Sequence, residues 1–487
     1  MIVHRDQRGG TEVARRRARG AGSALAGALL GFFMVTLDAL VVNVALPSIR
    51  HDLGGGMTGL QWVVDGYTLV FAALLLSAGA LSDRIGARRA FAAGLALFVA
   101  ASVACGLAPS LGVLVAARLV QGAGAALTMP TSLALVREAY PDAVQRARAI
   151  AVWAVGGAVA SAAGPVVGGS VTLLSWRLIF FINLPVGMGA LYLLSRLPRS
   201  PRRPVPFDWA GQVAAVAAMG ALTYGAIEAG AVGLAVPRVL AVLAVAVVAL
   251  AAFLVIEARG PHPMMPLGLV RSRPVAVSVS IGFAFTVGFY GLVFLFSLYF
   301  QEVRGLSPLA TGLAFMPMTA LSIVMNPVAA RLVERFGPRL PIASGQGLMA
   351  AGLLGLCVAA AGASIPLLSL LTIPIGFGAA LAIPTMTALL VNSVPAERAG
   401  TASGVLNTCR QLGGALSVAV FGALVAHRAT FLAGLQVSLV IAALLLLATA
   451  AASLLLPRVP AATAQAEQPP ARPLDRAATD EAWSAAC

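Results

Sequence analysis

Long apolar segments separated by short polar loops are the dominant pattern of this 487-residue chain. A helix that crosses a lipid bilayer needs about 20 mostly apolar residues, and fourteen segments of the chain come close to or exceed that length. These segments are 22–46, 61–81, 90–108, 111–136, 148–172, 177–195, 209–229, 236–257, 274–299, 308–330, 340–361, 365–390, 401–426 and 431–456. The pattern predicts an all-α polytopic membrane protein with fourteen transmembrane helices.

The composition supports a membrane setting, because 59% of the residues are hydrophobic and only 10% are charged. Soluble domains carry roughly 25% charged residues. A chain this apolar would precipitate in water, so a soluble protein is excluded.

The net charge of +15 comes from arginine alone, since the chain contains no lysine. Twenty-six of the 33 arginines fall in tails and loops on one side of the predicted helices, and five fall on the other. This bias is typical of the cytoplasmic side of a membrane protein and differs from the one-faced basic patch of a nucleic-acid-binding protein. It predicts that both termini are cytoplasmic. Abundant alanine and glycine, with arginine in place of lysine, indicate a GC-rich bacterial genome and hence the bacterial plasma membrane.

Two short motifs occur twice, at nearly the same offset. The charged hinge 79–89 has a weaker counterpart at 331–339, and 122–131 (GAGAALTMPT) aligns with 376–385 (GFGAALAIPT). Parallel repeats of this kind are common in secondary transporters. They predict that six helices within 22–195 correspond to six others within 274–456.

The remaining segments complete the predicted domain organisation. The basic cytoplasmic tail is 1–21, and cytoplasmic linkers with the two inserted helices 209–229 and 236–257 fill 196–273. The segment 457–487 is rich in proline and alanine without apolar periodicity, which predicts a disordered cytoplasmic tail.

Several motifs resemble those of the major facilitator superfamily. The hinge 79–89 is similar to that superfamily's loop 2–3 motif, and Gly164-Pro165-Val166-Val167-Gly168-Gly169 is similar to its antiporter motif. The segments 37–47 and 176–185 resemble the 14-span drug/proton antiporter branch, with actinomycete antibiotic exporters as the nearest subgroup. The resemblance implies the major facilitator fold, with two pseudo-symmetric six-helix bundles plus two inserted central helices, and drug export driven by protons. It also assigns Arg118, in the sequence Arg-Leu-Val-Gln-Gly, to proton coupling.

Charged residues inside predicted spans are the first candidates for chemistry, because a charge at the bilayer centre costs about 2.5–3.5 kcal/mol or more. Asp38 lies within the first span, where the apolar surroundings disfavour the charged form of its carboxyl group, so that the group could exchange a proton. Arg118 lies at similar depth in the fourth span, where it needs an anionic partner or backbone carbonyls. The helix packing that the superfamily resemblance implies makes these two spans neighbours, so we expect the two side chains to pair. The alternatives are that Asp38 only bonds the backbone of a neighbouring helix and that Arg118 is a structural clamp.

Other polar residues of the spans are weaker candidates. Asp65 is either a second proton-coupling acid or an interfacial carboxylate at the start of its helix. A polar group in the thirteenth span either lines the cavity or bonds neighbouring helices. The candidate cavity residues are Asn43, Gln121, Asn407, Arg410 and Gln411.

The hinge and the span-five glycines are candidates for controlling motion. Gly86 permits a tight turn, and Asp83 can cap a helix or pair with an arginine such as Arg137; the alternative is a solvated loop. The predicted gating residues are Gly79, Asp83, Arg84, Gly86, Arg88, Glu334, Arg335 and Gly337. Gly164, Pro165, Gly168 and Gly169 are expected to bend their helix and let another helix approach closely.

We therefore predict proton-coupled export of small amphipathic organic molecules. No metal-ligand cluster, phosphate-binding loop or nucleophile–base pair occurs in the sequence, so we expect no enzymatic activity, metal or cofactor, and the proton motive force as energy source. The expected partners are the substrate, protons and the lipid bilayer, without nucleic acid, and the protein is expected to be a monomer. The alternatives are a proton-coupled uptake symporter and a membrane sensor that transports nothing.

Overall fold

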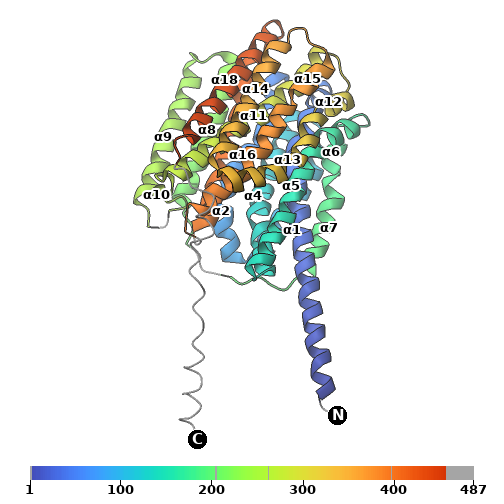
Figure 1. Ribbon diagram of the computed structural model, residues 1–487. Coiled ribbons are helices and arrows are strands. Elements are labelled where there is room, and N and C mark those ends of the chain that lie inside the picture. Colours follow the sequence, from blue (N-terminus) through green and yellow to red (C-terminus); the bar gives the residue numbers. More distant parts are fainter. Residues whose placement is uncertain (1–2, 203–205, 262, 396–397, 457–487) are drawn as a thin grey trace.

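The computed structural model describes residues 3–202, 206–261, 263–395 and 398–456, and every regular element in these ranges is helical. Figure 1 shows the helices as one bundle, from which the start of the first helix projects. The elements are α1 (Val3–Leu53), α2 (Gly56–Ile85), α3 (Ala87–Gly106), α4 (Leu111–Ala139), α5 (Ala143–Thr172), α6 (Leu178–Phe181), α7 (Asn183–Ser195), α8 (Trp209–Val232), α9 (Pro237–Arg259), α10 (Leu267–Val270), α11 (Arg273–Leu298), the π-helix η1 (Tyr299–Val303), α12 (Pro308–Ala314), α13 (Met316–Phe336), α14 (Arg339–Ala359), α15 (Ile365–Leu371), α16 (Ile373–Asn392), α17 (Ala399–Leu424), the 3-10 helix η3 (Arg428–Thr430) and α18 (Phe431–Ser453).

Within the described ranges, 12 helices are long and apolar enough to cross a membrane. Two more long helices, α13 with 21 residues and α17 with 26, are not among them. The predicted disordered tail 457–487 lies outside the described residues. Helix α1 begins at Val3, so its backbone runs through the predicted basic tail.

Three of the predicted spans are each divided into two helical segments. The divisions fall between α6 and α7, between α12 and α13, and between α15 and α16. In each case a proline, namely Pro185, Pro317 or Pro374, stands in the first turn of the second segment. Proline has no backbone N–H to donate and its ring clashes with the preceding turn, so the helix is interrupted there.

The repeated glycine motifs pack in corresponding ways. Gly122 of α4 lies against the backbone of α2, and Gly124 lies against the backbone of α3. Gly376 and Gly378 of α16 lie in the same way against the backbones of α13 and α14. The internal repeat of the sequence therefore corresponds to a repeated set of close helix contacts.

The two hinges also share a backbone conformation. Gly86 ends α2 with φ 92°, and Gly337 ends α13 with φ 72°. Residues with a side chain rarely adopt positive φ, so glycine is favoured at both positions. Each hinge reverses the chain into the next long helix, α3 or α14.

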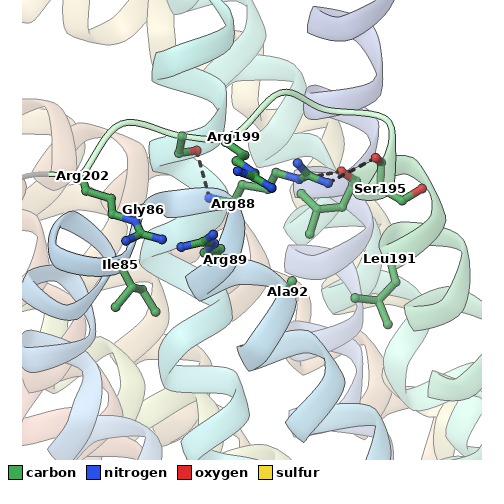
Figure 2. Close-up of a pocket in the computed structure, with 11 residues that line it drawn as sticks. Ile85, Gly86, Arg88, Arg89, Ala92, Leu191, Ser195, Arg199 and Arg202 are labelled. Atoms are coloured by element: carbon green, nitrogen blue, oxygen red, sulfur yellow. Dashed lines mark hydrogen bonds between the residues drawn. The ribbon is translucent and has the colours of Figure 1, made fainter.

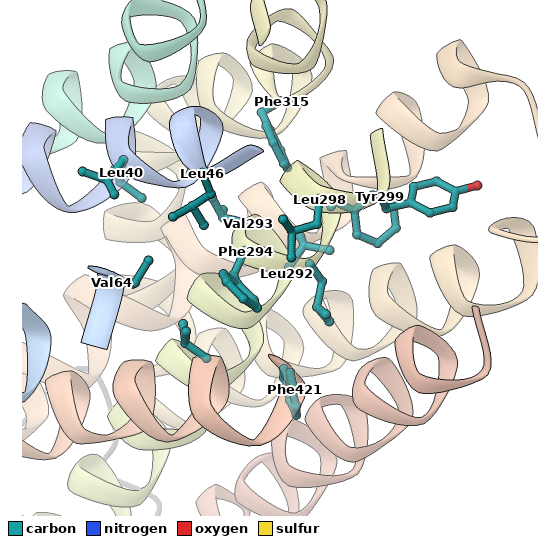
Figure 3. Close-up of a cluster of buried hydrophobic side chains, with 14 of the residues drawn as sticks. Leu40, Leu46, Val64, Leu292, Val293, Phe294, Leu298, Tyr299, Phe315 and Phe421 are labelled. Carbon is teal, nitrogen blue, oxygen red and sulfur yellow. The ribbon is translucent and has the colours of Figure 1, made fainter. Parts of the chain in front are cut away.

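A core of buried apolar side chains joins the first repeat (22–195) to the second (274–456). Leu40 and Leu46 of α1 belong to it together with Phe294 of α11 and Phe421 of α17, each 2% exposed or less. Figure 3 shows these side chains in one cluster. We call the end of the bundle opposite the N-terminus in Figure 1 the far end, and the end from which the start of α1 projects the terminal end.

Candidate functional site

A buried ion pair joins α1 to α4. Asp38 is 0% exposed and Arg118 is 1% exposed, and Arg118 Nη1 lies 2.5 Å from Asp38 Oδ2. The pairing expected from the sequence is therefore present. Because removing one partner of such a pair leaves an uncompensated buried charge, the two side chains depend on each other.

Two amide side chains complete the surroundings of the Asp38 carboxylate. Gln121 Nε2 donates to Asp38 Oδ1 at 2.9 Å, and Asn183 Nδ2 donates to the same oxygen at 2.8 Å. Gln121 Oε1 also accepts from Arg118 Nη1 at 2.8 Å, which closes a ring of polar contacts. Three donors are thus directed at the two oxygens of Asp38.

Arg118 is fixed by further contacts. Its Nε donates to the Val63 carbonyl of α2 at 3.0 Å, and its guanidinium carbon lies 4.3 Å from the centre of the Tyr67 ring. The Tyr67 hydroxyl donates to the Val35 carbonyl of α1 at 3.1 Å. The pair is thus tied to α1, α2 and α4, and through Asn183 to α7, so a change in its charge acts on four helices.

Asn183 and Ser102 are parts of this site that the sequence did not reveal. Asn183 Nδ2 donates to Ser102 Oγ of α3 at 2.9 Å, and Ser102 Oγ donates to the Phe180 carbonyl at 2.8 Å. The available signal for Asn183 was a lone amide within an apolar span. Ser102 had no comparable signal, because serine commonly bonds its own helix.

Asp65 is buried apart from this network. Its side chain is 0% exposed, and neither carboxyl oxygen accepts a hydrogen bond from a described residue. The Thr68 hydroxyl instead donates to backbone carbonyls of Val64 and Asp65, at 3.2 and 3.4 Å. This burial excludes the solvated interfacial alternative.

The polar residues of α17 form a separate group. Arg410 Nη1 donates to Asn407 Oδ1 at 3.4 Å, and Asn407 Nδ2 donates to the Ser403 carbonyl of its own helix at 3.0 Å. The guanidinium carbon of Arg410 lies 5.7 Å from the Phe285 ring centre, and Gln411 is half-buried. No contact among the described residues connects this group to Asp38. Asn43, 1% exposed, also stands apart and donates to Ala39 of its own helix.

The span-five glycines lie where α5 meets two other helices. A Cβ added at Gly164 would lie 2.8 Å from Leu40 Cβ, and one at Gly168 would lie 2.9 Å from the Val41 carbonyl oxygen of α1. A Cβ at Gly169 would clash with the Pro308 carbonyl of α12, and Pro165 lies inside α5. Gly169 therefore permits contact between the backbones of the first and second repeats, whereas Gly164 and Gly168 permit close contact between α5 and α1 within the first repeat.

An ion pair that the sequence analysis missed also joins the repeats at the far end. Arg50 Nη2 lies 2.6 Å from Glu302 Oε1, and Gln301 Nε2 donates to the Val44 carbonyl at 2.9 Å. Glu302 and Gln301 belong to η1, and π-helical segments are frequent at functional sites. Together with the α5–α12 contact, these interactions close the far end of the bundle.

The hinge residues are at the terminal end. Arg88 Nε and Nη2 donate to the Leu194 and Ser195 carbonyls, at 3.1 and 3.2 Å, which connects α3 to the end of α7. Asp83 is exposed, and no ion pair with Arg137 occurs among the described residues.

The other predicted gating residues differ in position. Gly79 lies within α2 with open space around it, and Arg84 and Arg335 are exposed at the ends of α2 and α13. The side chain of Glu334 is outside the described part. Within that part, no group of three or more His, Cys, Asp or Glu could hold a metal ion.

Membrane-length helices around a buried acid–base pair define a polytopic membrane transporter. The chain belongs to the Major Facilitator Superfamily, whose sequence model matches residues 28–418. It is 40% identical over 400 residues to the multidrug resistance protein Stp of Mycobacterium tuberculosis, covering 82% of this chain and 74% of that protein.

Two Streptomyces proteins are similarly related. The tetracenomycin C resistance and export protein of Streptomyces glaucescens is 37% identical, covering 82% of this chain and 75% of that protein. The methylenomycin A resistance protein of Streptomyces coelicolor is 38% identical, covering 85% and 89%. The sequence relationship to these proteins extends across most of the chain.

Solved structures agree on the fold at much lower identity. A POT family transporter crystallised with a thioalcohol-conjugated peptide matches with a TM-score of 0.66 at 14% identity, over 89% of this chain and 95% of that one. A bacterial homologue of the human lysosomal transporter Spinster, inward-facing and unoccupied, matches with a TM-score of 0.62 at 17% identity, over 89% and 96%. These likenesses concern the fold alone.

Proposed function

We propose that this protein exports small amphipathic molecules across the bacterial plasma membrane in exchange for protons. The observation that carries the proposal is the buried Asp38–Arg118 pair with its amide donors, in a chain whose relatives are named for drug and antibiotic resistance or export. A wholly structural role would not need an ionisable carboxyl group at this depth, where charge is costly.

The coupling step is a proton transfer to Asp38. In the geometry described, the carboxylate is held by Arg118, Gln121 and Asn183. A proton from water would convert it to the neutral acid and leave the buried Arg118 without its counter-ion. Breaking such a pair costs about 3–5 kcal/mol, so protonation favours a different arrangement of α1, α2 and α4. Asp38 is deprotonated while substrate binds and protonated while substrate leaves on the outside.

For the membrane topology we propose fourteen spans, with α13 and α17 added to the 12 helices of spanning length and composition. The matched packing of the glycines in α4 and α16 supports two six-helix halves. In this arrangement α8 and α9 form the central insertion. The arginine distribution supports cytoplasmic termini, which makes the far end extracellular.

The state described here is then closed to the outside. Opening requires α5 to separate from α12 and Arg50 to separate from Glu302, while the hinges at Gly86 and Gly337 change the terminal end. We assign the gating role to these contacts and leave the proton chemistry to Asp38.

Inside-out vesicles containing the purified protein test the proposal directly. With an acid lumen, the wild-type protein should accumulate ethidium, tetracenomycin C or methylenomycin A, and a protonophore should abolish accumulation. The Asp38→Asn variant should accumulate none at equal protein level. Accumulation only in right-side-out vesicles would establish the uptake symporter instead, and no movement of any compound by the wild type would favour the sensor.

A further inference from the structure

A cavity of about 690 Å³ opens at the terminal end, apart from the Asp38 site. It lies between the α2–α3 hinge and the segment that follows α7, as Figure 2 shows. Its lining residues are Ile85, Gly86, Arg88, Arg89, Ala92, Leu191, Leu194, Ser195, Arg199, Ser200 and Arg202. Four arginines and no acidic residue are among them.

The arginines of this cavity have few partners. The Arg88 side chain donates to two backbone carbonyls, and Arg89, Arg199 and Arg202 make no side-chain hydrogen bond or ion pair with a described residue. The carboxylate of Glu138 is connected to the cavity lining through Ser200, whose Oγ donates to Glu138 Oε2 at 2.6 Å. Four like charges around one space repel one another, so an anion placed among them would be stabilised.

The helix beneath the arginines strengthens this preference. Arg88 and Arg89 lie in the first turn of the 20-residue α3. A helix N-terminus carries a partial positive charge, which disfavours arginine there and favours an anion. The backbone N–H of Arg88 is already used, since it donates to Ser200 Oγ at 3.0 Å.

We propose that this cavity binds the phosphate headgroup of an anionic phospholipid. Arginine matches phosphate oxygens with paired hydrogen bonds. The apolar residues Ile85, Ala92 and Leu191 lie on the helix side of the arginines in Figure 2 and offer a surface for the glycerol and upper acyl chain. The cavity lies where membrane-spanning helices end, which is the depth of lipid headgroups.

A lipid held here would connect two segments that are distant in the sequence. Arg88 and Arg89 begin α3, whereas Arg199 and Arg202 belong to the linker toward α8. The site is independent of whether the protein exports drugs, because it depends only on charge, shape and membrane depth.

The test measures binding of dioleoylphosphatidylglycerol to the full-length protein in detergent by native mass spectrometry. The variant is Arg199→Gln/Arg202→Gln, and the matched control is Arg148→Gln/Arg271→Gln, which removes two exposed arginines outside the cavity. An arginine near an anionic headgroup contributes about fivefold in affinity. We therefore expect about 30-fold weaker binding in the variant, unchanged binding in the control, and little binding of phosphatidylcholine to any form.

Three outcomes would overturn the proposal. Equal losses in both double variants would mean that overall charge alone attracts the lipid. Equal binding of phosphatidylcholine, whose phosphate charge is balanced by choline, would mean that the site does not distinguish anionic from zwitterionic headgroups. Displacement of the lipid by millimolar inorganic phosphate or glycerol phosphate would identify a site for a soluble anion. Because the residues are on the surface, the single variant Arg199→Gln, expected to lose about fivefold, provides the same decision if the double variant folds poorly.

Discussion

At the scale of single residues, the first prediction concerns the buried Asp38 carboxylate, which accepts hydrogen bonds from three side-chain donors. We expect Asp38→Asn to lower the free energy of unfolding by about 3–5 kcal/mol, because Arg118 keeps its charge without a counter-ion. The double variant Asp38→Asn/Arg118→Gln removes both charges and should recover much of that loss, yet still fail to couple transport to protons. Thermal unfolding and vesicle transport measured together separate the two effects.

Asp52→Asn is the control for this prediction. Asp52 is partly exposed, and its Oδ2 lies 3.7 Å from Arg177 Nη1. A surface ion pair of this kind contributes about 0–1 kcal/mol to the free energy of unfolding. If Asp38→Asn were as stable as Asp52→Asn, the energetic dependence of Arg118 on Asp38 would be wrong.

Asn183 and Asn43 form a second matched comparison. Both are 1% exposed, but Asn183 donates to Asp38 and Ser102, whereas Asn43 donates only within its own helix. A hydrogen bond to a charged group contributes about 1.5–3 kcal/mol. We expect Asn183→Ala to reduce proton-driven transport at least tenfold and Asn43→Ala to change it less than threefold. Initial rates in vesicles measure this, and the reverse order would remove Asn183 from the coupling network.

These two asparagines show what the sequence could predict at this scale. The pairing of Asp38 with Arg118 could be predicted because an isolated charge in a bilayer must find a partner and because the superfamily resemblance implies that their two helices are neighbours. An amide N–H can donate equally well to its own helix backbone, as that of Asn43 does, or to a side chain of another helix, as that of Asn183 does. The choice depends on helix rotation and packing, which local sequence does not specify.

At the scale of elements, the contact between α5 and α12 carries the next prediction. A Cβ at Gly169 would meet the Pro308 carbonyl, a backbone group that cannot rotate away. Overpacking of this kind costs about 1–3 kcal/mol, so Gly169→Ala should shift the equilibrium away from far-end closure by about 5- to 150-fold. Distances between spin labels on the far ends of α5 and α12 report that shift.

Gly189→Ala in α7 is the control, since open space surrounds that position. Alanine there should be neutral or slightly stabilising, because glycine is a poor helix former. Unchanged far-end distances in Gly169→Ala would show that the contact does not control closure.

The sequence predicted helix positions well and helix interruptions poorly. Each apolar segment contains a helix, because length and hydropathy alone decide that a segment must satisfy its own backbone bonds. Pro317 and Pro374 divide their spans, whereas Pro130 and Pro384 remain inside continuous helices. Neighbouring helices decide which outcome a proline has, and a single segment does not contain that information.

For the whole molecule, the pair between Arg50 and Glu302 determines how firmly the far end stays closed. Its side chains are 26% and 13% exposed, so it is only partly screened by solvent. We expect Glu302→Gln to weaken closure by about fivefold, equivalent to about 1 kcal/mol. The charge reversal Arg50→Glu/Glu302→Arg should restore it, as measured by the same far-end distances at low and high salt. If neither Glu302→Gln nor the charge reversal alters those distances, the ion pair does not control closure of the far end.

At this scale, the duplicated motifs predicted more of the fold than the composition did. Gly86 and Gly337 share positive φ because the same reversal follows α2 and α13. By contrast, the pair of Asp83 with Arg137, one of the alternatives for Asp83, does not occur among the described residues, and Arg88 donates to carbonyls at the end of α7. An exposed charge has many possible partners, so its actual partner follows from the assembled loops rather than from the motif.

The charge network around Asp38 is confined to helices of the first repeat, and this confinement makes the molecule modular. Among the described residues, every side chain that hydrogen-bonds to Asp38 lies between 22 and 195, so the second repeat can change without altering the proposed proton-coupling network. A chimera that joins this first repeat to the second repeat of a related exporter would keep the energy source of one parent and take part of its cargo range from the other.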